Sequence, residues 1–265
     1  MWFLYGVWEM RIEMLSIERR EKIKEILLRR KNVTVVEMAE LFNVSTETIR
    51  RDFEQLSNEG FLIKTYGGAS LIFKKNISVS QKVKSTIMRE EKRQMAMQAA
   101  KLIQPDDCIF LDHTTTVFEL CDLLSRMPLT VLTNSLPVME ALSQYSNISL
   151  CATGGEFDMM SQAFFGIETI QYLKRHCLDK AFISCTSLDL LYGIHDYNDM
   201  SAEFHRSVID CADNIYLLAD HTKFDRSAFA RTSPLSSIDV LITDSRVSKE
   251  WKTYLEEQNV ELIDS

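Results

Sequence analysis

Short runs of β-branched and aliphatic residues alternate with helical patterns from residue 108 to residue 263. Seven runs have the length of strands: Cys108–Asp112, Thr130–Asn134, Ile148–Thr153, Ala181–Cys185, Ile215–Asp220, Val240–Asp244 and Val260–Ile263. Helical patterns occupy Glu90–Ile103 and about 117–125, 137–145, 164–175, 199–211 and 247–258. Because the strands are almost continuously apolar, both of their faces must be covered. The alternation therefore predicts an α/β domain, in which helices cover both faces of a mostly parallel sheet.

Polar residues stand directly after five of these predicted strands. In an open parallel sheet, ligands bind beyond the carboxyl ends of the strands, so these residues should meet at one edge. They are Asp112, His113, Thr114, Thr115, Thr116, Thr133, Asn134, Ser135, Gly154, Gly155, Cys185, Asp220 and Lys223. Each also has a structural explanation, since threonine caps helices, paired glycines form turns and Asp–Lys pairs form surface ion pairs. Five such loops at one edge favour an effector-binding site.

The first and fifth loops carry groups that suit an anion. Residues 114–116 are threonines at the predicted start of a helix, so their hydroxyls and free backbone N–H groups would hold a phosphate. Lys223 would add a positive charge, and Asp112 would accept hydrogen bonds from sugar hydroxyls. The pattern suits an anion such as phosphate.

Three amphipathic helices and a hairpin are predicted in the N-terminal part of the chain. The first helix spans Ser16–Arg30, with Ser16 as its N-cap, and the second runs from a cap at Thr34 to about Asn43. Ser45 caps the third. The short turn between the second and third helices indicates a helix-turn-helix. A β-prone stretch with a double glycine, residues 61–73, predicts a two-stranded wing after the third helix.

The third helix has the character of a DNA-recognition helix. Ile49, Phe53 and Leu56 form its apolar stripe, so the opposite side faces solvent or DNA. In this motif the N-terminal half of that helix enters the major groove, where arginine can bridge a guanine edge or hold a phosphate. We expect DNA contacts from Thr34, Ser45, Thr46, Glu47, Thr48, Arg50, Arg51, Lys64, Tyr66, Gly67 and Gly68.

The N-terminal motif resembles that of the DeoR family of bacterial regulators. The matching positions are Val44-Ser45-x-x-Thr48-Ile49-Arg50-Arg51-Asp52, then Leu56, Gly60, Leu62 and Tyr66-Gly67-Gly68-Ala69. Phe53 and Lys64 stand where the family usually has leucine and arginine. The resemblance implies a winged helix-turn-helix that binds operator DNA.

The C-terminal half is also similar to this family, whose sensor domain resembles sugar-phosphate isomerases in fold. The matching positions are Asp112, Thr115, Thr116, Thr133-Asn134-Ser135, Gly154-Gly155, Phe182-Ile183-Ser184 and Asp220-His221-Thr222-Lys223-Phe224. Thr114 replaces a usual glycine, Thr186-Ser187 replaces an acidic-glycine pair, and His205 stands near a usual lysine. The resemblance implies a sensor of sugar phosphates, and the departures leave the identity of the effector open.

Length and charge support a division into two domains. The 265 residues exceed the roughly 100–200 of a single domain. The net charge is −8 overall but +3 over residues 16–75, the sign that DNA phosphates require. We predict a winged helix-turn-helix at 14–70, a hinge at 71–88 and an effector-sensing α/β domain at 89–265.

Residues 1–13 are interpreted as a disordered tail or a mis-assigned start. The apolar stretch Met1–Trp8 is shorter than the roughly 18 residues that span a bilayer, and it lacks the basic region of a signal peptide. The six cysteines lack the spacing of a zinc knuckle, and several lie in apolar runs, as buried reduced thiols do. We expect a cytoplasmic protein with no membrane partner, cofactor or metal.

The sequence thus predicts a transcription regulator that acts on double-stranded operator DNA as a homo-oligomer, either a dimer or a tetramer. The family resemblance favours a repressor of a sugar-catabolism operon that a phosphorylated sugar or related metabolite relieves. One alternative is a ligand-independent regulator with a degenerate sensor site. Another is an isomerase-like enzyme, with acid–base groups such as His113, His195 and His205. The enzyme is disfavoured because the chain has no nucleophile elbow or dinucleotide fingerprint, so no catalytic residue is expected.

Overall fold

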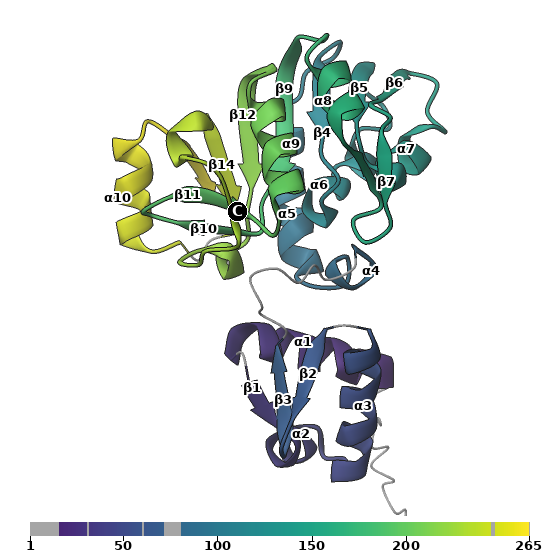
Figure 1. The fold of residues 1–265 in the computed structure, drawn as a ribbon, viewed down its shortest axis with the longest axis vertical. Coiled ribbons are helices and arrows are strands. Elements are labelled where there is room, and N and C mark those ends of the chain that lie inside the picture. Colours follow the sequence, from purple (N-terminus) through teal and green to yellow (C-terminus); the bar gives the residue numbers. More distant parts are fainter. Residues whose placement is uncertain (1–15, 31, 60, 72–80, 245–246, 265) are drawn as a thin grey trace, which may run out of the picture. The chain divides into compact units, whose positions relative to one another are not determined.

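The computed structural model describes residues 16–30, 32–59, 61–71, 81–244 and 247–264 (Figure 1). The chain divides into two compact units, Met1–Ile72 and Phe73–Ser265, and each is described by itself. The predicted tail, 1–13, and most of the predicted hinge, 72–80, lie outside the described residues. Residues 81–88, also expected to be hinge, form a short helix and a turn of the second unit.

Unit 1 is the predicted winged helix-turn-helix. Its elements are α1 (Ser16–Arg30), β1 (Asn32–Thr34), α2 (Val35–Phe42), α3 (Thr46–Asn58), β2 (Leu62–Thr65) and β3 (Gly68–Leu71). Two predicted caps are confirmed: the Thr34 hydroxyl accepts from the Glu37 N–H at 3.1 Å, and the Ser45 hydroxyl accepts from the Thr48 N–H at 3.1 Å. Asn43 ends α2 in the left-handed conformation that asparagine tolerates.

The wing sheet has one strand more than the sequence predicts. β1 pairs antiparallel with β3, which gives the strand order β1-β3-β2. This pairing explains Gly68, because a Cβ atom there would lie 2.2 Å from the Val33 carbonyl oxygen. β1 has only three residues, too few to show a strand period in the sequence.

A buried ion pair joins the first helix to the recognition helix. Asp52 of α3 is 3% exposed, and its carboxylate accepts from Arg19 Nε of α1 at 2.6 Å. Arg20 lies 3.6 Å from the same carboxylate. Asp52, which belongs to the Arg50-Arg51-Asp52 run, therefore faces inward while its two neighbours are exposed. The ion pair fixes the position of α3 relative to α1.

Unit 2 is built on a parallel sheet. Its strands are β4 (Cys108–Leu111), β5 (Leu129–Thr133), β6 (Ile148–Ala152), β9 (Leu178–Ser184), β12 (Ala212–Leu218), β14 (Val240–Thr243) and β15 (Glu261–Asp264). They lie in the order β15-β14-β12-β9-β4-β5-β6, and every neighbouring pair is parallel. The predicted α/β class is confirmed, and all seven strands fall within two or three residues of the predicted runs.

The chain order of the strands reverses next to β4. The chain leaves β4 outward to β5 and β6, then crosses to the other side of β4 and continues outward from β9 to β15. In open parallel sheets the connections on the two sides of such a reversal diverge and ligands bind there; this place, at the carboxyl ends of β4 and β9, is called the crevice below. The topology therefore places the candidate ligand site at these two strand ends.

Helices cover both faces of the sheet (Figure 1). The helices α5 (Arg89–Ala100), α6 (Thr115–Phe118) and α7 (Leu136–Leu142) pack into one apolar core, while α8 (Ile167–Leu173), α9 (Asp199–Ile209) and α10 (Lys249–Glu257) pack into the other. Successive residues of one strand enter opposite cores, as Ile109 and Phe110 do in β4. No helix in the described ranges is long and apolar enough to cross a membrane.

Unit 2 also contains smaller elements. They are α4 (Gln81–Lys84), the hairpin of β7 (Glu156–Asp158) and β8 (Ala163–Phe165), the antiparallel sheet of β10 (Ser187–Asp189), β11 (Gly193–Asp196) and β13 (Ala230–Ser233), and the 3₁₀ turns η1 (Cys121–Leu123), η2 (His221–Lys223) and η3 (Leu235–Ser237). The predicted helix at 164–175 begins instead as β8, because Gly166 has a φ of 108° that a helix cannot contain. The predicted helix at 117–125 is split into α6 and η1.

Candidate functional site

The exposed face of α3 carries the arginines expected to contact DNA. The side chains of Arg50 and Arg51 are 61% and 82% exposed. Glu47 lies 3.8 Å from each of them, so the three side chains form one exposed charged group. Thr46 is also exposed. An exposed guanidinium on this helix can reach base edges and phosphates.

Other predicted DNA contacts have partners within the unit. The Thr48 hydroxyl is hydrogen-bonded to the Ser45 hydroxyl at 2.9 Å, so both belong to the cap of α3. Lys64 of β2 forms an ion pair with Glu54 of α3, which ties the wing to the recognition helix. Thr34 is exposed but holds the start of α2.

The turn of the wing separates an exposed tip from a buried glycine. Tyr66 is fully exposed, and Gly67 takes a φ of 81° with open space around it. The Gly67 carbonyl accepts from the Val35 N–H at 2.9 Å. Gly68 is buried against β1, so the structure gives it a packing role, and its predicted DNA contact stays a prediction.

In unit 2, the predicted loops after β4, β9 and β12 meet at the crevice. Asp112, at the end of β4, accepts from the Ser184 N–H of β9 at 2.7 Å. Ser184 in turn accepts from Lys223 Nζ at 2.7 Å, which brings the loop after β12 to the same place. Asp220 is buried beside Lys223 and accepts from the Thr222 N–H at 3.0 Å. The sequence prediction thus groups Asp112, Asp220 and Lys223 as the structure does.

Asp112 orders the loop from inside and is not exposed to a ligand. Its side chain is 0% exposed, and Oδ1 accepts from both the N–H and the hydroxyl of Thr114, at 2.7 and 2.6 Å. The expectation of a free N–H at Thr114 is therefore wrong, and α6, which Thr114 caps, has only four residues. The role predicted for Asp112 on sugar hydroxyls does not fit a fully buried carboxylate whose two oxygens both have partners.

A buried imidazolium stands between two buried carboxylates. His205 of α9 lies 2.7 Å from Asp196 Oδ2 through Nδ1 and 3.5 Å from Asp112 Oδ2 through Nε2. Burial alone would lower the pKa of His205, but the Asp196 and Asp112 carboxylates outweigh burial and raise it to about 10. Thr232 also donates to Asp196 at 2.8 Å. His205 therefore carries a positive charge, as would the lysine that the DeoR resemblance leads one to expect near this position.

Two lysines that the sequence prediction missed join Lys223. Lys92 of α5 is 5% exposed, and its Nζ donates to the Thr115 hydroxyl at 2.9 Å and to the Lys84 carbonyl oxygen at 2.6 Å. Burial, reinforced by the charge of Lys223, lowers the pKa of Lys92 to about 7 and that of Lys84 to about 8. Lys92 and Lys223 thus lie near Asp220, and the charge of Lys223 also acts on Lys84, which opposes the simultaneous ionisation of the three lysines.

The remaining predicted residues have mainly structural partners. Thr133 donates to the Leu111 carbonyl at 2.7 Å, and Ser135 caps α7. Thr116 and Cys185 are buried, and burial raises the pKa of the Cys185 thiol to about 12. Gly155 packs against Phe165 and cannot accept a side chain, and the neighbouring Gly154 accepts through its carbonyl from the Thr169 hydroxyl at 2.6 Å. These residues shape the rim of the crevice.

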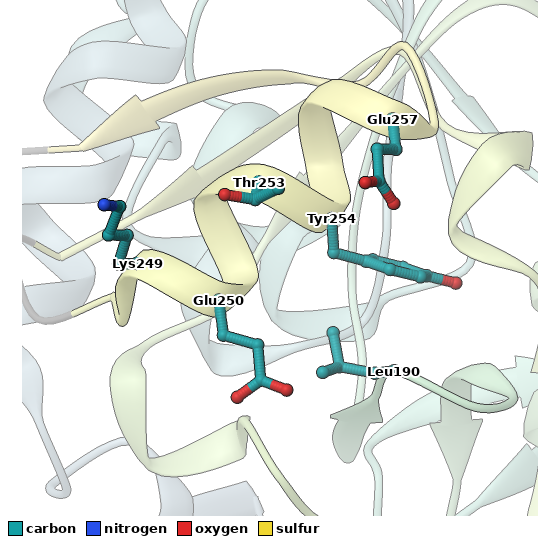
Figure 2. A pocket seen from close by; sticks show the side chains of 6 residues that line it. All are labelled: Leu190, Lys249, Glu250, Thr253, Tyr254 and Glu257. Atoms are coloured by element: carbon teal, nitrogen blue, oxygen red, sulfur yellow. The ribbon is translucent and has the colours of Figure 1, made fainter.

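A shallow groove lies elsewhere on the unit, between α10 and the β10–β11 turn (Figure 2). The groove is open and is lined by Leu190, Lys249, Glu250, Thr253, Tyr254 and Glu257. None of its lining residues belongs to the lysine cluster or to the loops after β4, β9 and β12. The groove therefore does not bear on the candidate site.

Each half of the chain matches a known family model. Residues 19–75 match the family model of the DeoR-like helix-turn-helix domain, and residues 87–245 match that of the DeoR C-terminal sensor domain. These halves define a DNA-binding regulator that carries a small-molecule sensor domain. The chain belongs to the DeoR family of transcriptional regulators, so it is a regulator and not an enzyme.

Relatives match the chain along nearly its whole length. A putative aga operon transcriptional repressor of Escherichia coli O157:H7 is 32% identical, and the match covers 93% of each chain. An L-fucose operon activator of Haemophilus influenzae is 29% identical, and the match covers 91% of this chain and 97% of the relative. A ribose 5-phosphate isomerase A structure from Methanocaldococcus jannaschii aligns at 16% identity and a TM-score of 0.39, over 52% of this chain and 55% of that one. A likeness at that score carries no functional argument.

Proposed function

We propose that this regulator is a cytoplasmic repressor of a carbohydrate-utilisation operon and that a small phosphorylated metabolite releases it from its operator. The observation that carries the proposal is the position of Lys92 and Lys223, whose ammonium groups donate to Thr115 after β4 and to Ser184 at the end of β9, with Lys84 on the helix that Lys92 contacts. Lys84 and Lys92 each have a lowered pKa because burial and neighbouring positive charge disfavour the ionised form. A bound dianion would relieve that repulsion, which makes the cluster a site for a phosphate group.

The operon class is supported by the relatives. The two relatives described above are named as regulators of the aga and L-fucose operons, one a repressor and the other an activator. Helix-turn-helix proteins read paired half-sites with two recognition helices, so we propose that the protein binds DNA as a dimer or a dimer of dimers. In this scheme the effector changes the balance between two arrangements of the sensor, only one of which binds the operator well.

Sugar phosphates should stabilise the folded protein. A ligand that binds only the folded state at 100 times its Kd adds roughly 2.7 kcal/mol, which raises the melting temperature by several degrees. The measurement is a thermal-shift screen with inorganic phosphate and a panel of pentose and hexose phosphates. Lys223→Ala should abolish the shift. A wild-type protein that responds to none of these compounds at millimolar concentration would indicate a ligand-independent regulator.

Arg51→Ala should weaken binding to DNA and leave effector binding unchanged. The exposed guanidinium on α3 is expected to contact a base edge or a phosphate, and its loss should lower affinity by about 10- to 100-fold. Duplexes selected by the wild-type protein from a random pool supply the DNA, and fluorescence anisotropy supplies the Kd. Arg93→Ala, an exposed arginine of α5, removes the same charge from unit 2 and should have little effect. Equal losses for the two variants would contradict a recognition role for Arg51.

A further inference from the structure

The helix α4 lies between the regions that the two family models cover. The helix-turn-helix model ends at residue 75 and the sensor model begins at residue 87, whereas α4 spans Gln81–Lys84. Both ends of α4 are nevertheless attached to the loop after β4. Gln81 Nε2 donates to the His113 carbonyl at 2.9 Å, and Lys92, which bonds to Thr115, also donates to the Lys84 carbonyl at 2.6 Å. The helix therefore packs against the loop after β4, next to Lys92.

Gln81 presents a buried acceptor that has no partner. Its side-chain nitrogen Nε2 donates to the His113 carbonyl oxygen. Its side-chain oxygen Oε1 is buried and makes no hydrogen bond with any described residue. The residue is 9% exposed. Buried amide oxygens in folded proteins are nearly always hydrogen-bonded, because an unpaired one forfeits its bonds to water. The unpaired Gln81 Oε1 can therefore accept a hydrogen bond from a donor group of a bound ligand.

Two neighbouring side chains have the same property. His113 Nδ1 and Asn134 Oδ1 are buried and lack partners within the described part of the chain. Burial lowers the pKa of His113 to about 4, so its ring is neutral and Nδ1 can exchange a hydrogen bond with a hydroxyl. Asn134 is joined to Phe164 through its amide, and the next residue, Phe165, packs edge-on against His113 with ring centroids 5.1 Å apart. Unpaired polar atoms of Gln81, His113 and Asn134 thus lie around His113, whose ring also stacks on that of His205.

We infer that Gln81 binds a hydroxyl group of the effector through Oε1, and that His113 and Asn134 complete a hydroxyl subsite next to the lysine cluster. The inference rests on the proposed function, because the lysines are taken to hold the anionic group of the same molecule. The ligand class that fits both subsites is a polyhydroxylated phosphate with hydroxyl donors close to the anion. Inorganic phosphate fills only the lysine subsite, so the two subsites can be tested separately.

The test replaces Gln81 by methionine, which keeps the length of the side chain and removes the amide. Isothermal titration of the full chain with inorganic phosphate, D-ribose 5-phosphate, D-glucose 6-phosphate and D-fructose 6-phosphate gives a Kd for each. We expect the wild-type protein to bind at least one sugar phosphate more tightly than inorganic phosphate. Gln81→Met should reduce that preference by roughly 5- to 100-fold, as the loss of a buried hydrogen bond does, and change the Kd for inorganic phosphate less than twofold.

Control variants distinguish the possible results of this test. Gln94→Met, at an exposed glutamine of α5, should leave every Kd unchanged. Gln81→Asn, which keeps an amide on a shorter stem, provides a second variant if the methionine variant melts below the wild type. A wild-type protein that binds sugar phosphates no more tightly than phosphate would overturn the hydroxyl subsite, as would a Gln81→Met variant that weakens all four ligands equally. Failure of the wild type to bind any of the four would instead count against the proposed function.

Discussion

Replacing His205 by glutamine should lower the free energy of unfolding of unit 2 by about 3–5 kcal/mol. The substitution leaves the Asp112 and Asp196 carboxylates, 0% and 3% exposed, without the positive charge between them. Burial opposes ionisation of both acids, but the His205 side chain holds the pKa of each below its usual range. Urea unfolding of the full chain, followed by circular dichroism, measures the change.

Two variants identify the cause of that loss. His205→Lys supplies a charge at the same place and should recover part of the stability, because the DeoR resemblance leads one to expect a lysine nearby. His176→Gln removes a half-buried histidine whose ring contacts the Tyr172 ring and carbonyl, so it should change stability by about 1 kcal/mol or less. If His205→Gln stays within that small range as well, the imidazolium does not balance the two carboxylates.

The sequence predicts the features of this protein that depend on local patterns. Thr34 and Ser45 cap their helices as expected, because a cap depends on residues only three positions apart. The seven strands of the sheet follow from continuous apolar runs, which only a sheet covered on both faces can accommodate. Asp112 and Lys223 meet because the carboxyl ends of parallel strands lie at one edge.

The sequence did not predict the features that depend on tertiary contacts. Lys84 and Lys92 lie on short or amphipathic helical stretches, where a lysine usually marks a solvated surface. Their actual position depends on the packing of α4 and α5 against the loop after β4. Asp52 looks equally like a surface charge until α1 supplies Arg19. Asp112 departs from its predicted role because Thr114 supplies partners to one of its oxygens and the distant strand β9 supplies a partner to the other.

The affinity for a phosphate group should fall as the pH rises above 7. In the free protein the pKa of Lys92 is about 7, lowered by burial and by the charges of Lys223 and Lys84, while Asp220 and Glu119 oppose the shift. A dianion favours the protonated lysine, so at pH 8 binding must take up protons, and each further rise in pH makes that uptake more costly. Because a phosphate monoester becomes dianionic above about pH 6, affinity should be greatest near pH 6–7.

Lys92→Met should remove much of this pH dependence and weaken phosphate binding by about 10- to 100-fold, the loss expected for a charge-assisted hydrogen bond. Lys84, whose pKa is about 8, remains and should leave a smaller decline between pH 7 and pH 9. Titration calorimetry with inorganic phosphate, in buffers of different ionisation enthalpy, measures affinity and proton uptake together. Lys101→Met, at an exposed lysine just beyond α5, is the matched control and should behave as the wild type. A wild-type affinity that holds constant or rises from pH 7 to pH 9 would show that the lysines do not receive the anion, since a site that must first be protonated cannot bind better as protons become scarce.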